Sequence, residues 1–470
     1  MLDRLRSFFA PRGQARSYDG AAGGRRWRAA GEMPAPLSAQ LSARGPLARR
    51  ARYLCANNAM AAAGADAWVS ALAGTGIRPT STNPVPDFRA AAASSFEAWT
   101  DVADLDGLGD FYALQALVAR RLVIDGEAFV VLSHALDGSL RLRVLDAEQI
   151  DPSMNRELPS GGRIISGIEF DAAGSRVAYH ILPDPPSLPF VRALDAVRVP
   201  ADLCLHVFRA EVAGQVRGVS WFAPVLLRLA ELDSAHDAQL VRQKVAALLT
   251  GFVVDPNGTA GGFTGELDGM GGLEGGLEPG TLKVLNPGQD VRFSDPAKVG
   301  AEVIDFLKTS AREIAAGLGV PASVLMGDFS DANYSSLRAS LLDFRRRVEA
   351  IQHHVMVFRL CRPIWRAFVT AEVLAGRLGA PGFERDPEAF LSARWITPRT
   401  DWVDPAKDVQ AELDAIAGGL MSRRQAVEAR GLAVEELDAE IAADRAREAT
   451  LGLTFGASTT NHPNNPEVQP

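Results

Sequence analysis

The sequence has few cysteines, with only Cys55, Cys204 and Cys361 in 470 residues. They lie far apart, and no two of them have the C-x-x-C spacing that metal sites and redox dithiols use. An odd number of isolated cysteines argues against a disulfide framework. We therefore expect three buried free thiols, which behave in a core as small apolar side chains.

Long apolar runs and an excess of basic residues are also missing. No run approaches the roughly 18 apolar residues that a membrane-spanning helix needs. The apolar stretch within residues 1–10 is too short for a signal peptide, so we expect an intracellular protein with no membrane partner. The 49 Lys and Arg residues stand against 57 Asp and Glu residues, which gives a formal charge of −8. This balance argues against a protein that coats DNA, but it allows local basic patches or a channel through which DNA passes.

The motifs of common catalytic sites are absent. There is no Walker A sequence, and the glycine-rich run 257–280 lacks the Lys-Ser/Thr ending of a phosphate loop. His353 and His354 are adjacent, so on a helix they point about 100° apart and cannot chelate one metal ion. Ser220 lacks the second glycine of a nucleophile elbow, and we interpret it as a helix N-cap. The sequence therefore predicts no catalytic residue and no cofactor.

Two acidic clusters keep a metal-dependent alternative open. Asp233 and Asp237 fall on one turn of a predicted helix, where they form either paired carboxylates or an exposed charged face. Asp328, Asp331 and Asn333 resemble a calcium loop loosely, but the sixth position is not glycine and no glutamate occupies the twelfth. The other interpretation of this second cluster is a hydrogen-bonded turn that caps the helix after it. We predict the turn and no metal.

The most regular feature is a helix–loop–helix stretch over residues 301–371. Its first helix has apolar residues spaced 3-4-3-4 and ends at Gly319, with Pro321 two residues further on. The second helix, over residues 335–371, would span roughly 55 Å at about 1.5 Å per residue. A rod of this length is more typical of a large assembly than of a single globular domain.

The apolar repeat of the long helix slips near its middle. Apolar residues recur every three or four positions as far as Phe358, and the repeat then continues at Cys361 after a step of three where four is due. Pro363 stands at the same place, and a proline inside a helix removes a hydrogen bond. The pattern predicts a kink here.

The rest of the chain predicts an α+β body followed by helices. Helices are expected over residues 45–73 and, in two segments with Leu108 and Leu117 on their apolar face, over residues 87–124. Short strands with hairpin-length loops then predict an antiparallel meander. These strands are Ala128–Ser133, Leu140–Leu145, Ile164–Phe170, Arg176–Ile181 and Leu203–Phe208.

The later segments are predicted in the same way. A helix is expected over residues 222–249, with Pro224 in its first turn, and an extended piece over residues 382–396. Three helices follow, over 404–417, after the capping box Ser422-x-x-Gln425, and over 434–449.

Basic residues gather in three places. Residues 1–35 form an Arg- and Gly-rich arm, which we expect to bind nucleic acid or, as we prefer, to pack on a neighbouring subunit. Arg49, Arg50 and Arg52 form a short cluster that we interpret as a solvated helix face. The run Arg345–Arg347 either contacts DNA or a neighbouring subunit, or forms salt bridges with Asp343 and Glu349 on its own helix.

Six groups of motifs follow one another along the chain. They are Tyr18–Ala21 with Arg49–Asn58, Asp125–Phe129, His206–Phe208 with Gln215–Ser220, Pro279–Thr281 with Leu285–Gln289, Gly319–Pro321 with Asp328–Arg338, and Trp402–Lys407 with Gly419–Gly431. In this order they resemble the lambda-type portal proteins of tailed bacteriophages and prophages over roughly residues 17–449. Gln289 departs from the acidic residue usual in that family's pattern.

The resemblance implies a homo-oligomeric ring, typically of twelve subunits, at one capsid vertex of a virion whose proteins are made in the bacterial host cytoplasm. It implies a passage for double-stranded DNA during packaging and ejection, without sequence-specific contacts. It also implies contacts with the terminase large subunit, the major capsid and scaffold proteins and the head–tail adaptor proteins, and no catalysis by the ring.

The resemblance further implies a portal-type subunit: an antiparallel β meander plus helices (wing), two stem helices, a small α/β clip, a long kinked helix and a helical crown. The expected segments are the arm (1–35), wing (36–219), first stem helix (220–250), clip with the Gly-rich loop (251–300), second stem helix (301–320), channel loop (321–334), long helix and return to the wing (335–399), crown (400–449) and a disordered tail (450–470).

The expected site residues fall into three groups. Those of the DNA-channel loop are Asp328, Ser330, Asp331, Asn333 and Tyr334. Those that anchor the flanking helices are Gly319, Pro321, Ser335, Ser336 and Arg338. Those that contact DNA or a neighbouring subunit are Arg345, Arg346 and Arg347.

Two other functions remain open from the sequence. The first is a metal-dependent nucleic-acid-processing enzyme that uses one of the aspartate pairs. The second is a structural scaffold of prophage origin with no role in handling DNA.

Overall fold

A computed structural model of the chain describes residues 33–192, 194–247, 251–254, 266–267, 273–274, 290–293, 300–330, 333–398 and 405–453. The predicted arm (apart from residues 33–35), most of the glycine-rich run, Asp331 and most of the predicted tail lie outside the described residues. Helices and antiparallel strands share the described part, as an α+β fold requires.

The body of the protein begins with four helices. The helix expected over residues 45–73 is in fact two helices, which meet at Asn58, and the side chain of Asn58 caps the second helix by accepting the Ala61 N–H. Leu108 and Leu117 are exposed rather than buried, because Leu108 lies in the loop before α5 and Leu117 faces solvent. The four helices are α2 (Pro36–Asn57), α3 (Ala59–Leu72), α4 (Pro86–Thr100) and α5 (Phe111–Ile124).

The strands between residues 127 and 208 form two sheets rather than the single expected meander. The first has the order β3-β2-β9, and the second is a meander with the order β4-β5-β6-β7-β8. The predicted strand Ile164–Phe170 is wrong as one strand. Positive φ angles at Ser166 and Gly167 turn it into a hairpin, as expected of a tight two-residue turn. The strands are β2 (Glu127–His134), β3 (Leu140–Leu145), β4 (Arg156–Glu157), β5 (Arg163–Ile165), β6 (Ile168–Phe170), β7 (Arg176–Ile181), β8 (Val197–Pro200) and β9 (Cys204–Phe208).

Strand β2 separates two apolar cores. Alternate side chains of a strand point to opposite faces. Ala128, Val130 and Leu132 accordingly pack in the large core with the helices, whereas Phe129 packs in a smaller core with the meander. β2 is therefore buried on both faces, which explains its nearly continuous apolar run.

A distant pair of strands closes the body. β1 (Arg78–Ser81) pairs with β14 (Ala393–Ile396) in antiparallel register. The expected extended piece over 382–396 is only partly right, because α11 (Pro387–Leu391) precedes β14. This pairing returns the chain to the body after the long helix.

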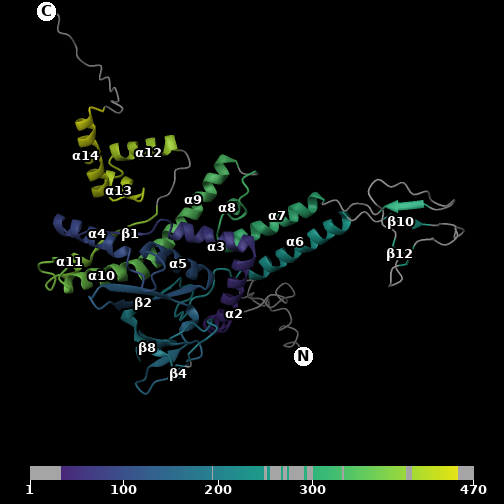
Figure 1. Cartoon of the computed structure of the whole chain (residues 1–470), viewed down its shortest axis with the longest axis horizontal. Helices are drawn as coiled ribbons and strands as arrows, with labels where there is room; N and C mark the ends of the chain where they lie inside the picture. Colours follow the sequence, from purple (N-terminus) through teal and green to yellow (C-terminus); the bar gives the residue numbers. More distant parts are fainter. Residues whose placement is uncertain are drawn as a thin grey trace, which may run out of the picture.

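Two helices project from the body side by side, and we call them the stem (Figure 1). They are α6 (Leu226–Ala247) and α7 (Ala301–Leu318). The first begins four residues later than expected, so Pro224 lies in the turn before the helix, and Ser220 is buried in that turn and does not cap α6. At the far end of the stem, the described residues form only strands: β10 (Gly251–Val254) with β13 (Asp290–Phe293), and β11 (Glu266–Leu267) with β12 (Leu273–Glu274).

The long helix contains an internal π-helix. It runs without a break through α9 (Tyr334–Ile351), a π-helical stretch (Gln352–Cys361) and α10 (Arg362–Leu374). The predicted slip of the apolar repeat therefore has a cause in the backbone. A π turn holds more residues than an α turn, so the buried face of the long helix shifts around the helix axis at this stretch. Phe358, expected in the apolar seam, is instead 56 % exposed.

Three short helices end the described chain: α12 (Pro405–Ala417), α13 (Arg423–Glu428) and α14 (Val434–Leu451). The predicted capping box of Ser422 and Gln425 is confirmed at the start of α13. The three cysteines are buried and free, as predicted. Within the described residues, no helix combines the length and the apolar character needed to cross a membrane.

Candidate DNA-channel and ring-contact surfaces

The predicted channel loop is built from turns and caps. Gly319 ends α7 with a φ of +73°, a left-handed conformation that glycine adopts without strain. Pro321 then precedes the short helix α8 (Ala322–Met326), which ends at Gly327. The described part of the loop thus leaves the stem through a left-handed glycine and a short helix.

The acidic cluster in this loop forms a turn, as predicted. The Asp328 carboxylate accepts the Ser330 N–H at 3.0 Å and the Ser330 hydroxyl at 2.6 Å. These hydrogen bonds hold the pKa of Asp328 below its ordinary value. Both side chains are exposed. Among the described residues, no group of His, Cys, Asp and Glu is arranged to hold a metal ion.

Asn333 starts the long helix. Its side-chain oxygen accepts the Ser336 N–H and the Ser335 hydroxyl, both at 2.8 Å. Tyr334, which follows, is the first residue of α9. The predicted cap is confirmed, and it satisfies a backbone donor that the first turn of a helix leaves unpaired.

Two basic residues of α9 have acidic partners. Arg338 donates to Asp408 of α12 at 2.9 Å, which links the long helix to the C-terminal helices. Arg347 pairs with Asp343 one turn earlier at 2.7 Å, as one of the two alternatives predicted. Arg346 is exposed and Arg345 is half-buried.

The stem exposes large apolar side chains on both of its helices. On α6, Leu240 and Val241 are each 57 % exposed, and on α7, Ile304 and Phe306 are 47 % and 62 % exposed. Neighbouring positions on a helix point about 100° apart, so these side chains cover more than one side of the stem. Soluble monomers rarely expose apolar groups together in this way.

The polar face of α6 is solvated. Asp233 and Asp237 are exposed, and Asp233 accepts a hydrogen bond from Asn58. Arg228 joins the two stem helices through an ion pair with Glu313 at 2.8 Å. The two aspartates thus form the exposed charged face that was one of the predicted alternatives.

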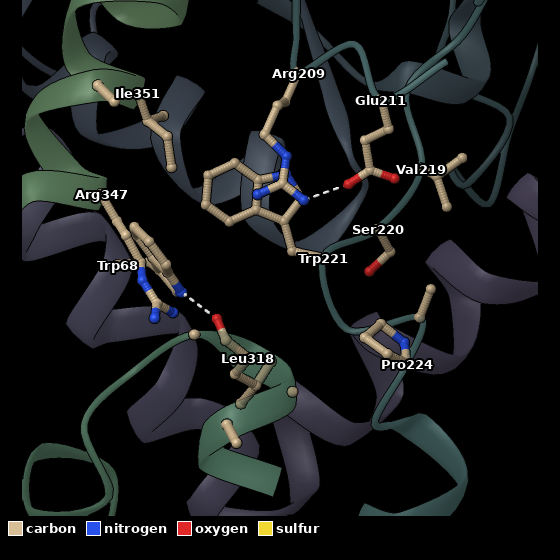
Figure 2. A pocket seen from close by; sticks show the side chains of 15 residues that line it. Trp68, Arg209, Glu211, Val219, Ser220, Trp221, Pro224, Leu318, Arg347 and Ile351 are labelled. Carbon is tan, nitrogen blue, oxygen red and sulfur yellow. Dashed lines mark hydrogen bonds and ion pairs between the residues drawn. The ribbon is translucent and has the colours of Figure 1, made fainter. Parts of the chain in front are cut away.

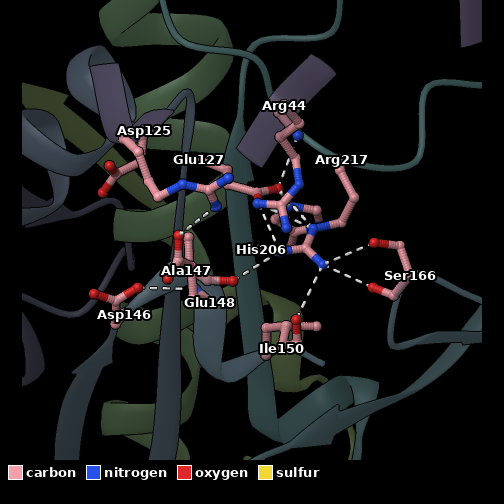
Figure 3. A network of polar contacts seen from close by, with 12 residues as sticks. Arg44, Asp125, Glu127, Asp146, Ala147, Glu148, Ile150, Ser166, His206 and Arg217 are labelled. Carbon is pink, nitrogen blue, oxygen red and sulfur yellow. Dashed lines mark hydrogen bonds and ion pairs between the residues drawn. The ribbon is translucent and has the colours of Figure 1, made fainter. Parts of the chain in front are cut away.

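A buried charge network ties the stem to the body, and the sequence did not reveal it (Figure 3). The carboxylate of Glu127 on β2 is fully buried. It accepts hydrogen bonds from Arg217 at 2.7 Å, Arg44 at 2.8 Å, His206 at 2.9 Å and the Gly218 N–H at 2.8 Å. Charge-assisted bonds of this kind are about twice as strong as neutral ones. They join α2, β2, β9 and the segment that leads into the stem.

Protonation in this network follows from burial and charge. Burial alone would raise the pKa of Glu127, but Arg217 and Arg44 outweigh it and hold that pKa well below its ordinary value. Burial lowers the pKa of His206 to about 4. The other ring nitrogen of His206 has no hydrogen-bond partner, which suits a neutral ring that donates only to Glu127.

Two glycines allow the backbone segments of the network to touch. A Cβ on Gly126, whose φ is +88°, would lie 2.1 Å from the Val219 carbonyl carbon. A Cβ on Gly218 would lie 2.1 Å from the Gly126 oxygen. One feature of the sequence could have indicated this network. In Gly126-Glu127 and again in Arg217-Gly218, a charged residue stands next to a glycine in an otherwise apolar stretch.

The interpretation of Arg52 as part of a solvated face is wrong. Its guanidinium donates to Asp125 at 2.6 Å and to Asp146 at 3.1 Å, and its side chain is only 24 % exposed. The reason is that α2 packs against the turn before β2, which carries Asp125. Arg49, by contrast, is 63 % exposed.

A groove lies where the stem, the long helix and the body meet (Figure 2). Its volume is about 780 Å³. The indoles of Trp68 and Trp221 meet edge to face at 5.0 Å, and the Arg209 guanidinium lies 4.7 Å from the Trp221 ring centre. The Trp68 N–H donates to the Leu318 carbonyl at 2.9 Å, which fixes the end of α7 against α3.

The described structure thus combines a stem that exposes apolar side chains, a buried ionic joint at its base and a long helix behind the connecting loop. The sequence comparison is specific. The family model described as "Phage portal protein, lambda family" matches residues 23–352, and the chain belongs to this family. Portal proteins are structural, so this chain is not an enzyme, and the metal-dependent alternative is wrong.

Relatives in the curated collection are portal proteins. The chain is 24 % identical over 379 residues to a probable portal protein of Halomonas phage phiHAP-1, covering 78 % of this chain and 72 % of that protein. It is 23 % identical over 322 residues to portal protein B of Escherichia phage lambda, covering 61 % of this chain. The match spans 59 % of the length of the lambda protein.

Solved structures resemble the chain more distantly. A chain from the neck of a native gene transfer agent particle, computed with C12 symmetry, has a TM-score of 0.48 at 16 % identity and covers 88 % of this chain and 94 % of that one. An HK97 family portal protein from Corynebacterium diphtheriae has a TM-score of 0.32 at 14 % identity, covering 77 % and 97 %.

Proposed function

We propose that this portal protein forms a closed ring of about twelve copies at one vertex of a phage-like capsid. The exposed apolar side chains of the stem carry the proposal. A ring closes through heterologous contacts, in which each subunit offers two different faces to its neighbours. Leu240 and Val241 on α6, and Ile304 and Phe306 on α7, supply apolar groups on different sides of one projecting element.

Double-stranded DNA passes through this ring during packaging and ejection. The loop between α7 and α9 presents Asp328, Ser330 and Asn333 to solvent, and this loop borders the channel in our proposal. The formal charge of −8 supports passage without tight binding, because each lysine or arginine contact with a phosphate adds affinity and slows sliding.

The strands at the far end of the stem dock the terminase large subunit and later the head–tail adaptor proteins. The α+β body contacts the capsid and scaffold proteins, and α12–α14 form the crown. The finished ring resides in the virion after synthesis in the host cytoplasm. Imaging of DNA-filled particles from a strain that lacks the gene tests the DNA role, since such particles do not form if the chain is the portal.

Ring assembly is tested at the stem. Phe306→Asp and Leu240→Asp place a charge in the proposed apolar contact, and we expect them to abolish rings seen by negative-stain imaging and native mass spectrometry. Leu136→Asp is the matched control, because Leu136 is fully exposed in a hairpin loop of the body. Rings that persist in both stem variants would refute the stem contact.

A further inference from the structure

Two arginines from different elements lie over one buried aromatic ring. β9 is an outer strand of its three-stranded sheet, and the π-helical stretch Gln352–Cys361 packs against it. In this stretch, the guanidinium carbon of Arg359 lies 4.3 Å from the centre of the Phe208 ring. The guanidinium carbon of Arg176, the first residue of β7, lies 5.6 Å from the same centre. Two cations therefore meet at a ring that is only 2 % exposed.

These two arginines contact carbonyl groups and rings. Arg176 donates to the carbonyls of Gln215 and Val216 at 2.8 and 3.3 Å, and Arg359 reaches the His206 carbonyl at 3.5 Å. Within the described part of the chain, no carboxylate pairs with either of them. The Nε–H of Arg176 is buried and has no hydrogen-bond partner among these residues. A buried donor without a partner is rare in native proteins and commonly marks the place of a water molecule or an ion.

The charges of the two arginines are uncompensated. Burial, and next the charge of Arg176, lower the pKa of Arg359 from its ordinary value. Stacking on a ring attracts a cation but does not neutralise it. Arg52, which is also partly buried, shows the usual solution, because it pairs with Asp125 and Asp146. Both Arg176 and Arg359 are half-buried, so a small ion can still reach them from solvent.

We propose that Arg176 and Arg359 together bind one oxyanion with two negative charges, of the size of inorganic phosphate, beside the Phe208 ring. A dianion compensates both guanidinium groups at once, whereas a single carboxylate compensates one. Each guanidinium presents a fork of N–H donors that matches two oxygens of such an ion. The bound anion ties the meander, which carries Arg176, to the long helix, which carries Arg359. This site goes beyond the proposed function and does not rest on it.

Isothermal titration calorimetry of the full-length chain with inorganic phosphate tests the site. The titration is made at constant ionic strength and at about pH 8, where phosphate carries close to two negative charges. We expect one phosphate to bind per chain. Arg359→Gln removes one guanidinium but keeps a polar side chain, and it should weaken phosphate binding by about tenfold or more, because hydrogen bonds to charged groups contribute at least this much. Absence of phosphate binding, or equal affinity in the variant, overturns the proposal.

A matched variant separates the site from a general effect of charge. Arg156 is exposed on β4 of the same meander, so Arg156→Gln should bind phosphate like the unaltered chain. Thermal melting gives a second readout, since a ligand of the folded state raises the melting temperature. Phosphate should stabilise the unaltered chain and Arg156→Gln, but not Arg359→Gln. Equal stabilisation of all three chains would be a general salt effect and would overturn the proposal.

Free phosphate and the phosphates of DNA share the same oxygen chemistry, so a second titration distinguishes them. It uses duplex DNA without terminal phosphates, in which each phosphodiester carries one negative charge. We expect Arg359→Gln to bind this duplex as the unaltered chain does. Weaker DNA binding by the variant would assign the site to phosphodiesters and overturn the proposal. Native mass spectrometry of the same variant reports ring formation separately, so failure of this site and failure of the proposed function are distinguishable.

Discussion

Removing the charge of Glu127 tests the buried ionic joint directly. Glu127→Gln keeps the size of the side chain but removes the carboxylate to which both Arg44 and Arg217 donate, and the exposed fractions of these arginines are 4 % and 1 %. The amide oxygen still accepts a hydrogen bond, so the change isolates the charge. The two guanidinium groups then stay buried and lose the counter-charge that they contact directly.

The expected cost is large compared with the stability of a protein domain. Removing one partner of a buried ion pair costs about 3–5 kcal/mol, because the other charge stays desolvated and uncompensated. A domain is stable by only about 5–15 kcal/mol. For a domain of about 150–250 residues, each kcal/mol shifts the melting temperature by about 2–4 °C, so the variant should melt roughly 6–20 °C lower.

Thermal and urea denaturation of the variant, followed by circular dichroism, measure this cost. Glu388→Gln is the matched control, because Glu388 forms a bidentate pair with Arg366 in which the side chains are 65 % and 40 % exposed. Exposed ion pairs contribute little, so the control should melt like the unaltered chain. A Glu127→Gln variant that melts with the control would show that the joint does not stabilise the body.

Other predictions concern pH, packing and the loop. The pKa of His206 is about 4 in the folded chain and 6.5 in its ordinary state, so the unfolded chain binds a proton at a higher pH than the folded chain does. The free energy of unfolding should therefore fall by up to about 3 kcal/mol as the pH drops from 6.5 to 4. In urea titrations at several pH values, His206→Gln should flatten this dependence on pH. Gly126→Ala should cost more than about 3 kcal/mol, since its Cβ meets backbone and φ is +88°, and an unchanged urea midpoint would contradict the close contact. Asn333→Ala should lose about 1 kcal/mol through the missing cap, measurable by local hydrogen exchange at α9, and Asn333→Ser should restore most of it. Asp328→Lys should leave the ring intact but reduce DNA packaging, whereas Asp328→Asn, which keeps the turn, should reduce it less; equal packaging by all three chains would mean that this residue does not face DNA.

The local patterns of the sequence predicted most helices and several strands. The strands Leu140–Leu145 and Arg176–Ile181 have the predicted bounds, and the Ser422 capping box lies where it was expected. Local errors arose where a residue had to be judged from its neighbours along the chain alone. Arg52, for example, looks solvated on its own helix, and only the packing of α2 against the turn before β2 gives it Asp125 as a partner.

The candidate surfaces were predicted unevenly. The turn at Asp328 and the helix cap at Asn333 were predicted correctly because these side chains bond to residues two or three positions away. The groove between Trp68 and Trp221 was missed, since its lining residues come from separate segments of the chain, which begin at Trp68, Arg209, Ala316 and Arg347. The exposed apolar side chains of the stem were not predicted from the sequence, because the amphipathic pattern of the two helices looks ordinary.

The sequence by itself determined the family, the absence of the common catalytic motifs and several helix ends, such as the one at Gly319. These depend on residue order, composition and short-range hydrogen bonds. Only the tertiary structure decided that β1 pairs with β14, and that Glu127 meets partners 79 to 91 positions away. The physical reason is that desolvation acts through space. The residues next to Glu127 in the sequence do not indicate which arginines neutralise its charge in the folded chain.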